Sequence, residues 1–422
     1  MSSPECTSSP FPEIDPDLLA DCIHCGLCLE TCPTFIHTGR EEESPRGRLL
    51  LMNGLSTGRW GPENEVRGHL DLCLGCRACE TACPSGVQYG RLLEETRAAL
   101  RNTGGYRRSG MEDFLVDKIL RRGRMLERLV VIYRALSLWR LLRAIGEVPI
   151  LPRAWRLRLR LAPRPEKPVK RISIQHSSGP WAVVFRGCVA RALFPGTEAA
   201  MMELLHRGGY RVVQLGEPEC CGALAEHVGN RTRTRELGRR VLAEVPENAI
   251  LIPTAAGCGA HLKALPHVLG GEVESASDLA GRVRDLSEAL LEAPRPLSFQ
   301  GAPPVRVVYQ DACHLRHGQG IADQPRELLT RSGALLVDAG DADLCCGSAG
   351  TYNLARPELA RRIGRSKAKS LVDSGARTVV TGNPGCAIQL EGVLPENMEV
   401  ISLARFLRDR LAPWCPDTSV PS

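Results

Sequence analysis

The sequence predicts a mixed α+β and α/β fold, in which a largely helical N-terminal domain is followed by two repeated parallel α/β domains. Three observations predict it. Two runs of four cysteines with identical spacing lie in the first 95 residues, a longer cysteine pattern occurs twice after residue 180, and short apolar runs alternate with helical stretches in both copies of that pattern. Strands that alternate with helices are typical of parallel sheets.

The composition favours a cytoplasmic, metal-binding chain. Of the 422 residues, 18 are cysteine, and cytoplasmic thiols are kept reduced, so metal ligation explains them better than disulfides do. Residues 1–10 contain neither the basic nor the apolar segment of a secretory signal. No stretch of the sequence has the length and hydropathy of a membrane span. We therefore expect a cytoplasmic protein whose contact with the inner face of the cell membrane, if it has one, is peripheral.

The two N-terminal runs predict two iron–sulfur clusters. Both have the spacing C-x2-C-x2-C-x3-C followed by proline, and the cysteines are Cys22, Cys25, Cys28, Cys32, Cys73, Cys76, Cys79 and Cys83. This spacing is typical of ferredoxins with two [4Fe–4S] clusters, in which the fourth cysteine of each run binds the other cluster. The N-terminal domain is thus expected to be a bis-[4Fe–4S] ferredoxin-like domain. We expect one cluster on Cys22, Cys25, Cys28 and Cys83, and the second on Cys73, Cys76, Cys79 and Cys32.

Zinc is the alternative, but a structural zinc site usually takes four ligands in two separated pairs. His24 lies inside the first run and is expected beside the cluster or at the surface rather than as a ligand. The segment 45–48, Pro-Arg-Gly-Arg, is expected either to offset the negative charge of the clusters or of a docking partner, or to form a solvated turn. Clusters of this kind carry single electrons and do not themselves oxidise an organic substrate, so no catalytic residue is predicted.

Residues 96–178 are predicted to form a basic helical segment and a linker. Between Arg91 and Arg171 there are 21 Lys and Arg against 8 Asp and Glu. Apolar residues at helical spacing predict helix over 110–145, and repeated prolines indicate a linker over 162–171. Two roles stay open: a docking surface for an anionic membrane or an acidic partner subunit, and a helical pair packed on the ferredoxin-like domain. Nucleic acid is not expected as a partner, because no recognition motif accompanies the charge.

The repeated part contains four cysteines per copy, two of them adjacent and followed by glycine. The sets are Cys188, Cys220, Cys221 and Cys258, and Cys313, Cys345, Cys346 and Cys386. The first cysteine precedes the adjacent pair by 32 residues in both copies. Short apolar runs that read as strands precede the cysteines, at 182–185, 211–215, 250–254, 305–309, 335–338 and 378–381, and helices are expected at 198–206 and 357–371.

Because the carboxyl ends of parallel strands share one edge of a sheet, we expect the four thiols of each copy to meet. They are candidates for a third site that holds a further Fe–S cluster or a zinc ion in one copy or both, and metal-free thiols are the alternative. His261 is either an extra ligand or a surface or core residue. His314 and His317 flank Cys313 and are either proton carriers near a redox centre or polar residues at a helix start.

The order of two ferredoxin motifs and two Cys-Cys-Gly repeats resembles the family of glycolate oxidase iron–sulfur subunits. The strings that carry the resemblance are HLDLCLGC at 69–76, ETACPSGV at 80–87, PRGR at 45–48, LCCGSAGTY at 344–352 and AGCG at 256–259. The resemblance covers nearly the whole chain. The Cys-Cys-Gly repeats also occur in heterodisulfide reductase subunits, lactate-utilisation proteins and the iron–sulfur subunit of anaerobic glycerol-3-phosphate dehydrogenase.

The resemblance implies a glycolate dehydrogenase complex, in which a flavin-bearing partner subunit oxidises glycolate and this chain passes the electrons towards quinone or another acceptor. FAD is expected only on the partner, because the chain has no Gly-rich nucleotide-binding fingerprint. The alternatives are a subunit of a lactate or glycerol-3-phosphate dehydrogenase, a heterodisulfide-reductase-like catalytic subunit, and a zinc-binding scaffold. Disulfide reduction is disfavoured, because His261 and Gln389 occupy the positions where the reductases carry a fifth thiol.

The predicted domains are residues 1–95 for the two-cluster ferredoxin-like domain, 96–178 for the basic segment and linker, and 179–300 and 301–412 for the two cysteine-rich domains.

Overall fold

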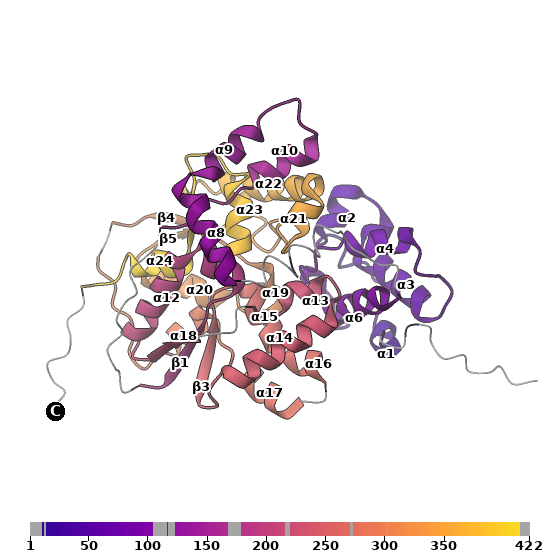
Figure 1. Ribbon diagram of the computed structural model, residues 1–422, viewed down its shortest axis with the longest axis horizontal. Coiled ribbons are helices and arrows are strands. Elements are labelled where there is room, and N and C mark those ends of the chain that lie inside the picture. Colours follow the sequence, from indigo (N-terminus) through magenta and orange to yellow (C-terminus); the bar gives the residue numbers. More distant parts are fainter. Residues whose placement is uncertain are drawn as a thin grey trace, which may run out of the picture.

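The computed structural model describes residues 11, 14–103, 116, 123–167, 179–215, 220–270, 273–301 and 303–413. Figure 1 shows the N-terminal helices on one side of the molecule and the two sheets with their helices on the other. The helices Leu138–Ile145 and Arg153–Arg160 of the basic segment lie at the top, and its helix Gly123–Ala135 runs down towards the middle. The predicted fold class is confirmed: a helical N-terminal region precedes two parallel sheets.

The N-terminal region consists of short helices around the two cysteine runs. They are α1 (Pro16–Ala20), α2 (Pro33–Thr38), the 3-10 turn η1 (Glu41–Glu43), α3 (Pro45–Ser56), α4 (Asn64–Asp71), α5 (Ala78–Thr81) and α6 (Tyr89–Asn102). Pro33, directly after the first run, is the first residue of α2. The Ser44 hydroxyl caps α3 by accepting a hydrogen bond from the Gly47 amide at 3.0 Å. The helices meet around a leucine-rich core that includes Leu55, Leu70 and Leu92.

The first repeat is built on a three-stranded parallel sheet of order β2-β1-β3. Its strands are β1 (Trp181–Phe185), β2 (Arg211–Gln214) and β3 (Ala249–Pro253), as the apolar runs predicted. The helices of this repeat are α11 (Cys188–Leu193), α12 (Pro195–Arg207), α13 (Ala223–His227), α14 (Arg231–Glu244), α15 (Ala256–Lys263), α16 (Leu265–Leu269), α17 (Val273–Arg282) and α18 (Leu286–Leu291).

The second repeat has a four-stranded parallel sheet of order β5-β4-β6-β7. The strands are β4 (Arg306–Gln310), β5 (Leu335–Val337), β6 (Thr378–Thr381) and β7 (Glu399–Ser402), and the helices are α19 (Cys313–Gln319), α20 (Asp323–Arg331), α21 (Tyr352–Ala355), α22 (Pro357–Asp373), α23 (Pro384–Glu391) and α24 (Leu403–Arg408). Strand β7 was not predicted. In the first repeat the corresponding pairing is a single bridge between Leu251 and Val283.

The two repeats share one hydrophobic core. Leu204 of α12, Leu329 of α20 and Leu407 of α24 are fully buried in the same cluster, which also takes in side chains from β1 and β4. Because so many aliphatic side chains are buried between the sheets, the two repeats form one packed unit and not two separate domains.

The basic segment contains α8 (Gly123–Ala135), α9 (Leu138–Ile145) and α10 (Arg153–Arg160). The helix predicted over 110–145 is broken after Ala135, where Ser137 has a φ of 50°, and most of 104–122 lies outside the described residues. Helix α8 packs against α11, and α10 packs against α22. Among the described helices of this segment, α8 and α10 therefore pack on the repeats and not, as one alternative expected, on the ferredoxin-like domain.

Candidate iron–sulfur sites

The eight cysteines of the two runs line two adjacent cavities. Cys22, Cys25, Cys28 and Cys83 border one of them, and Cys32, Cys73, Cys76 and Cys79 border the other. Pro45, Cys79 and Tyr89 belong to the walls of both. In each cavity the cysteine before proline thus joins three thiols of the other run. Four thiols around a closed space are the donor set that a [4Fe–4S] cubane requires.

Both loops bend through the same two backbone conformations. The second residue between the first two cysteines has a positive φ, 56° at His24 and 65° at Gly75, and so does the residue after the second cysteine, 84° at Gly26 and 64° at Arg77. Each loop therefore uses one glycine and one ordinary residue in the left-handed region, which costs energy for the ordinary residue. His24 is exposed, which fits the expectation of a residue beside the cluster or at the surface.

A buried cation lies beside the second cavity. Arg48 of α3 is 0% exposed and donates hydrogen bonds to the Glu43 carboxylate at 2.6 Å, the Thr34 hydroxyl at 3.0 Å and the His69 carbonyl at 2.8 Å. The second Glu43 oxygen lies 2.7 Å from Nδ1 of His69. The segment 45–48 therefore begins a helix and places a guanidinium next to the thiols, so the solvated-turn interpretation is wrong.

Arg97 is a second buried cation, close to Cys73, and the sequence pattern did not single it out. It donates hydrogen bonds to the carbonyls of Leu70 at 2.9 Å and Cys73 at 2.8 Å. Burial raises the pKa of the Cys73 thiol, but the Arg48 and Arg97 guanidiniums outweigh it, so that the pKa is lowered overall. The wall of the first cavity instead carries Arg46, a partly exposed residue that pairs with Glu41. The second site is the more positive of the two.

The four thiols of the first repeat converge at the carboxyl edge of its sheet. The Cys220 thiol lies beside the Cys188 and Cys221 thiols, and Cys221 also contacts Cys258. Gly222 follows with a φ of 100°, and a Cβ there would approach Nε2 of His261 to 3.2 Å. His261 is buried, and burial lowers its pKa. It packs over the Cys-Cys-Gly turn.

The thiols of the second repeat converge in the same way and also reach the ferredoxin-like domain. The Cys345 thiol lies beside the Cys313 and Cys346 thiols and beside Cys76, which belongs to the second N-terminal run. Cys346 in turn contacts Cys386. Cys76 and Cys345 belong to one buried cluster that also includes Tyr352 and Ile363. The sequence predicted that each set of thiols would meet, but not that one set would touch a cluster ligand.

The histidines near Cys313 have different surroundings. His314 is largely enclosed, and burial lowers its pKa to about 3; its Nδ1 lies 3.5 Å from the Cys313 sulfur. His317 instead joins domains, because its Nδ1 lies 2.8 Å from the Thr81 hydroxyl of α5 and its Nε2 lies 2.9 Å from the Asp343 carbonyl. His317 is thus a structural link between the second repeat and the ferredoxin-like domain.

Within the described ranges, no three His, Cys, Asp or Glu side chains are arranged to hold a single metal ion. In the same part of the chain, no helix combines the length and the apolar character of a membrane span.

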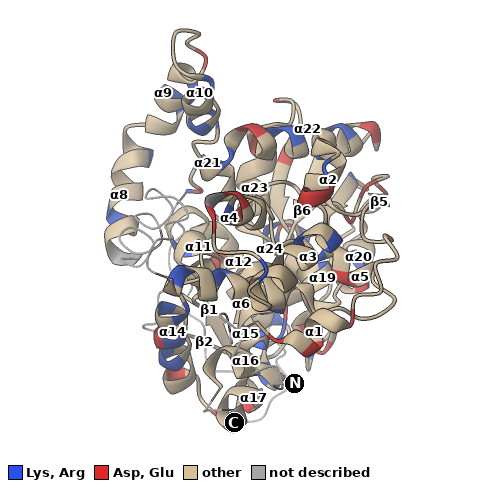
Figure 2. Ribbon diagram, turned by 90° about the vertical axis from the view of Figure 1, so that its right-hand side faces the viewer, with Lys and Arg blue, Asp and Glu red and all other residues tan. Residues whose placement is uncertain are grey.

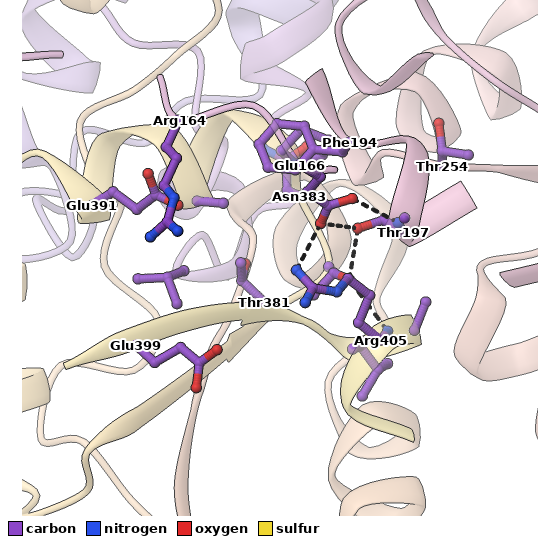
Figure 3. Close-up of a pocket in the computed structure, with 18 of the residues that line it drawn as sticks. Arg164, Glu166, Phe194, Thr197, Thr254, Thr381, Asn383, Glu391, Glu399 and Arg405 are labelled. Carbon is purple, nitrogen blue, oxygen red and sulfur yellow. Dashed lines mark hydrogen bonds and ion pairs between the residues drawn. The ribbon is translucent and has the colours of Figure 1, made fainter. Parts of the chain in front are cut away.

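A cavity of about 940 Å³, which the sequence did not predict, lies between the two repeats and α9. Figure 3 shows its wall at Glu166, whose carboxylate binds the Thr197 hydroxyl and the Arg405 guanidinium, each at 3.0 Å. Asn383 also lines it and donates a hydrogen bond to the Cys386 sulfur at 3.4 Å. The cavity therefore borders the last thiol of the second repeat.

Two domain families match the chain. The model described as "4Fe-4S dicluster domain" matches residues 18–87, and the model described as "Cysteine-rich domain" matches residues 182–263 and 307–391. The N-terminal domain is therefore a 4Fe–4S dicluster domain with two [4Fe–4S] clusters, and the two repeats are cysteine-rich domains of one kind.

The chain is similar to other proteins over most of its length. The chain is 35% identical to the probable glycolate oxidase iron–sulfur subunit of Bacillus subtilis, over 94% of each chain. It is 34% identical to the glycolate oxidase iron–sulfur subunit of Escherichia coli, over 88% of this chain and 90% of that one. Identity to a heterodisulfide reductase protein of Methanosarcina acetivorans is 24%, over 87% of both. The chain belongs to the family of glycolate oxidase iron–sulfur subunits.

Proposed function

We propose that this chain is the electron-transfer subunit of a glycolate oxidase complex, which takes electrons from a flavin on a partner subunit and passes them towards quinone or another acceptor. The observation that carries the proposal is the contact between Cys76 and Cys345. It joins the dicluster domain to the thiols of the second repeat through adjacent sulfur atoms. Such a continuous row of thiols suits the transfer of single electrons, which is the chemistry that [4Fe–4S] clusters supply when bound.

The cluster ligands in this proposal are the thiols that border each cavity. Cys22, Cys25, Cys28 and Cys83 hold the first cluster, and Cys73, Cys76, Cys79 and Cys32 hold the second. Cys25 is the one exposed thiol among the sixteen described cysteines. The first cluster is therefore the entry point for electrons, because its ligand loop lies at the surface. Arg48 and Arg97 stabilise added negative charge at the second cluster, which favours transfer from the first to the second.

The second repeat is the proposed site of a third centre, held by Cys313, Cys345, Cys346 and Cys386. Its support is the direct contact with Cys76, together with burial of Cys345, Cys346 and Cys386 to 3% exposure or less. The corresponding thiols of the first repeat, Cys188, Cys220, Cys221 and Cys258, contact each other, and they are proposed to hold zinc or to remain free thiols.

In this proposal the chain works in the cytoplasm, against the inner face of the cell membrane. The flavin-bearing partner binds over the exposed loop of the first cluster. That partner performs the oxidation of glycolate, and this chain supplies no catalytic residue for it.

The test is co-purification of the chain with its flavin-bearing partner under anaerobic conditions. Addition of glycolate to the complex should reduce the clusters of this chain, observed by electron paramagnetic resonance. The isolated chain should give no cluster signal with glycolate but a full signal with dithionite. Oxidation of glycolate by the isolated chain with an artificial acceptor would contradict the proposal.

A further inference from the structure

The three helices of the basic segment carry large apolar side chains that face solvent. Along α8 and its end, Met125 is 36% exposed, Leu129 50%, Ile132 54% and Leu136 65%. Their spacing of four, three and four residues places them on one face of a helix. These side chains stay exposed although α8 packs against α11. Part of the apolar pattern that predicted this helix therefore forms an outward stripe, whereas Val130 of the same pattern is buried.

The stripe continues to a projecting tip. Leu141 and Ile145 of α9 are 56% and 37% exposed, and in the loop between α9 and α10 Val148 is 40% and Ile150 is 88% exposed. Figure 1 shows α9 and α10 at the top edge of the molecule, and Figure 2 shows the same helices projecting from the body. Contiguous exposed apolar side chains of this kind mark an interaction site.

The charge around the stripe is positive. Residues 123–167 contain eleven Lys and Arg but three acidic residues, Glu127, Glu147 and Glu166. All three acids are already paired: Glu127 with Arg191, Glu147 with Arg160, and Glu166 with Arg405. Exposed arginines remain on α8 and α9, namely Arg128 and Arg140, and the blue residues of α8, α9 and α10 are visible in Figure 2.

An aromatic residue stands next to the tip. Trp155 of α10 is 57% exposed, and the guanidinium of Arg158 lies 5.5 Å from its ring centre. Tryptophan and arginine at the edge of an apolar surface are typical of proteins that sit in the interfacial region of a bilayer.

The segment is anchored firmly at its base, so the stripe is held in one orientation. Arg158 donates a hydrogen bond to the Leu354 carbonyl of the second repeat at 2.7 Å. Arg143 pairs with Glu391 at 3.4 Å, and the Tyr133 hydroxyl binds the Pro163 carbonyl at 2.9 Å. Exposure of the apolar face is thus a property of the folded segment and not a sign of loose packing.

We propose that α8, α9, α10 and the loop 146–152 form a docking surface for an anionic lipid bilayer, with Val148 and Ile150 inserted among the acyl chains. The narrow, projecting tip favours a bilayer over a protein partner, because a bilayer accepts apolar side chains without a matching surface, and the exposed arginines match anionic headgroups. The inference builds on the proposed place of the chain at a membrane and is independent of its electron transfer.

The test is sedimentation of the full chain with vesicles of phosphatidylcholine, alone or mixed with phosphatidylglycerol. Binding to the mixed vesicles is expected, and weaker binding to phosphatidylcholine alone or in high salt. Val148→Asp and Ile150→Asp should each lower binding to mixed vesicles by about 10-fold or more. Val372→Asp on α22, where Val372 is 41% exposed, is the matched control and should leave binding within about twofold of the unaltered chain.

Equal binding of Ile150→Asp and the unaltered chain would overturn the proposal, and so would the absence of binding to anionic vesicles. Loss of the co-purified flavin-bearing partner in Ile150→Asp, with vesicle binding intact, would assign the tip to a protein partner instead. Dithionite reduction of the clusters, measured on the same samples, should be unchanged in every variant. A failure of the electron-transfer proposal would appear in the reduction of the clusters and would leave vesicle binding unchanged.

Discussion

The two cysteine-rich repeats have the same thiol spacing and the same strand order at their centre, yet they face different neighbours. In the second repeat the thiols touch Cys76 of the dicluster domain. In the first, the neighbouring region contains His261, His227 and Glu94 of α6. The second sheet also gained a full strand, β7, where the first has a single bridge. Duplication thus preserved the thiol geometry, while placement against the dicluster domain decided which copy lies in the row of sulfur atoms.

The largest expected difference between the repeats is in electron transfer. Cys345→Ser should lower the rate of acceptor reduction by the complex about 100-fold, because it removes the thiol on which the other three and Cys76 converge. The matched change Cys220→Ser in the first repeat should lower the rate less than about threefold. Steady-state assays with glycolate and an artificial quinone compare the two. Equal losses in both variants would show that the repeats act alike.

Substitution of the glycines after the adjacent cysteines should sharpen the comparison in stability. Gly347 has a φ of 86°, and a Cβ there would lie 2.6 Å from the Ala360 carbonyl oxygen, whereas at Gly222 the nearest atom is 3.2 Å away. We expect Gly347→Ala to cost about 3 kcal/mol in the free energy of unfolding and Gly222→Ala about 1–2 kcal/mol. Anaerobic denaturant unfolding measures both. A larger loss of unfolding free energy in Gly222→Ala than in Gly347→Ala would contradict the close approach of a Cβ at position 347 to the Ala360 carbonyl oxygen.

Removal of the buried cation should change the potential of the cluster that faces the second repeat. Arg48→Met is expected to lower the reduction potential of the second cluster by on the order of 100 mV, because a positive charge near it is lost. Arg48→Lys keeps the charge and should stay closer to the original value. In Arg48→Met the buried Glu43 carboxylate loses its cation, which could disturb folding. The double variant Arg48→Met, Glu43→Gln removes that charge as well and serves as the control. Redox titration followed by electron paramagnetic resonance measures the shift. An unchanged reduction potential in Arg48→Met and in the double variant would refute the claim that Arg48 raises the potential of the second cluster.

The smallest expected effect concerns how the first repeat is attached. Burial raises the pKa of Glu94, but its ion pair with His227, whose Nδ1 lies 3.6 Å from the carboxylate, outweighs burial and lowers the pKa to about 2, from an ordinary value of 4.5. A lowered pKa means that ionised Glu94 stabilises the fold above pH 4.5, and that this contribution is lost as the pH falls from 4.5 to 2.

In Glu94→Gln, the free energy of unfolding should therefore fall by about 2 kcal/mol less than in the unaltered chain as the pH drops from 4.5 to 2. Tyr352→Phe is the matched change on the second repeat, because its hydroxyl donates an uncharged hydrogen bond to the Leu72 carbonyl at 3.1 Å. It should cost about 1 kcal/mol at every pH in this range. Thermal unfolding between pH 2 and 7 distinguishes the two variants. If Glu94→Gln and the unaltered chain lost the same stability between pH 4.5 and 2, the ion pair of Glu94 with His227 would be rejected.

Much of this arrangement was predictable from the sequence because spacing carries the information. The six apolar runs before the cysteines are all strands, and the spacing of 32 residues in both copies fixed two equivalent units. The exchange of the fourth cysteine between the runs, as in Cys83 and Cys32, was also implied by the motif. These features are local, or they repeat along the chain.

The rest depends on how distant surfaces meet, which residue spacing does not encode. Nothing in the run around Cys76 indicates that Cys345 will lie against it, and Arg97 is an ordinary helical arginine in the sequence. Strand β7 was missed because Glu399–Ser402 is short and does not precede a cysteine of the repeat. The apolar stripe of α8 was predicted correctly as helical, but periodicity alone does not tell whether such a face packs inward or outward.

The central claim is that the thiols of the second repeat, and not those of the first, extend the row of iron–sulfur centres. The most direct measurement is iron and acid-labile sulfide per chain after anaerobic purification of the unaltered chain, Cys345→Ser and Cys220→Ser, with zinc measured on the same samples. We predict about 12 iron atoms in the unaltered chain, about 8 in Cys345→Ser and about 12 in Cys220→Ser, since each cubane holds four. About 8 iron atoms in all three would contradict the claim and confine the clusters to the dicluster domain.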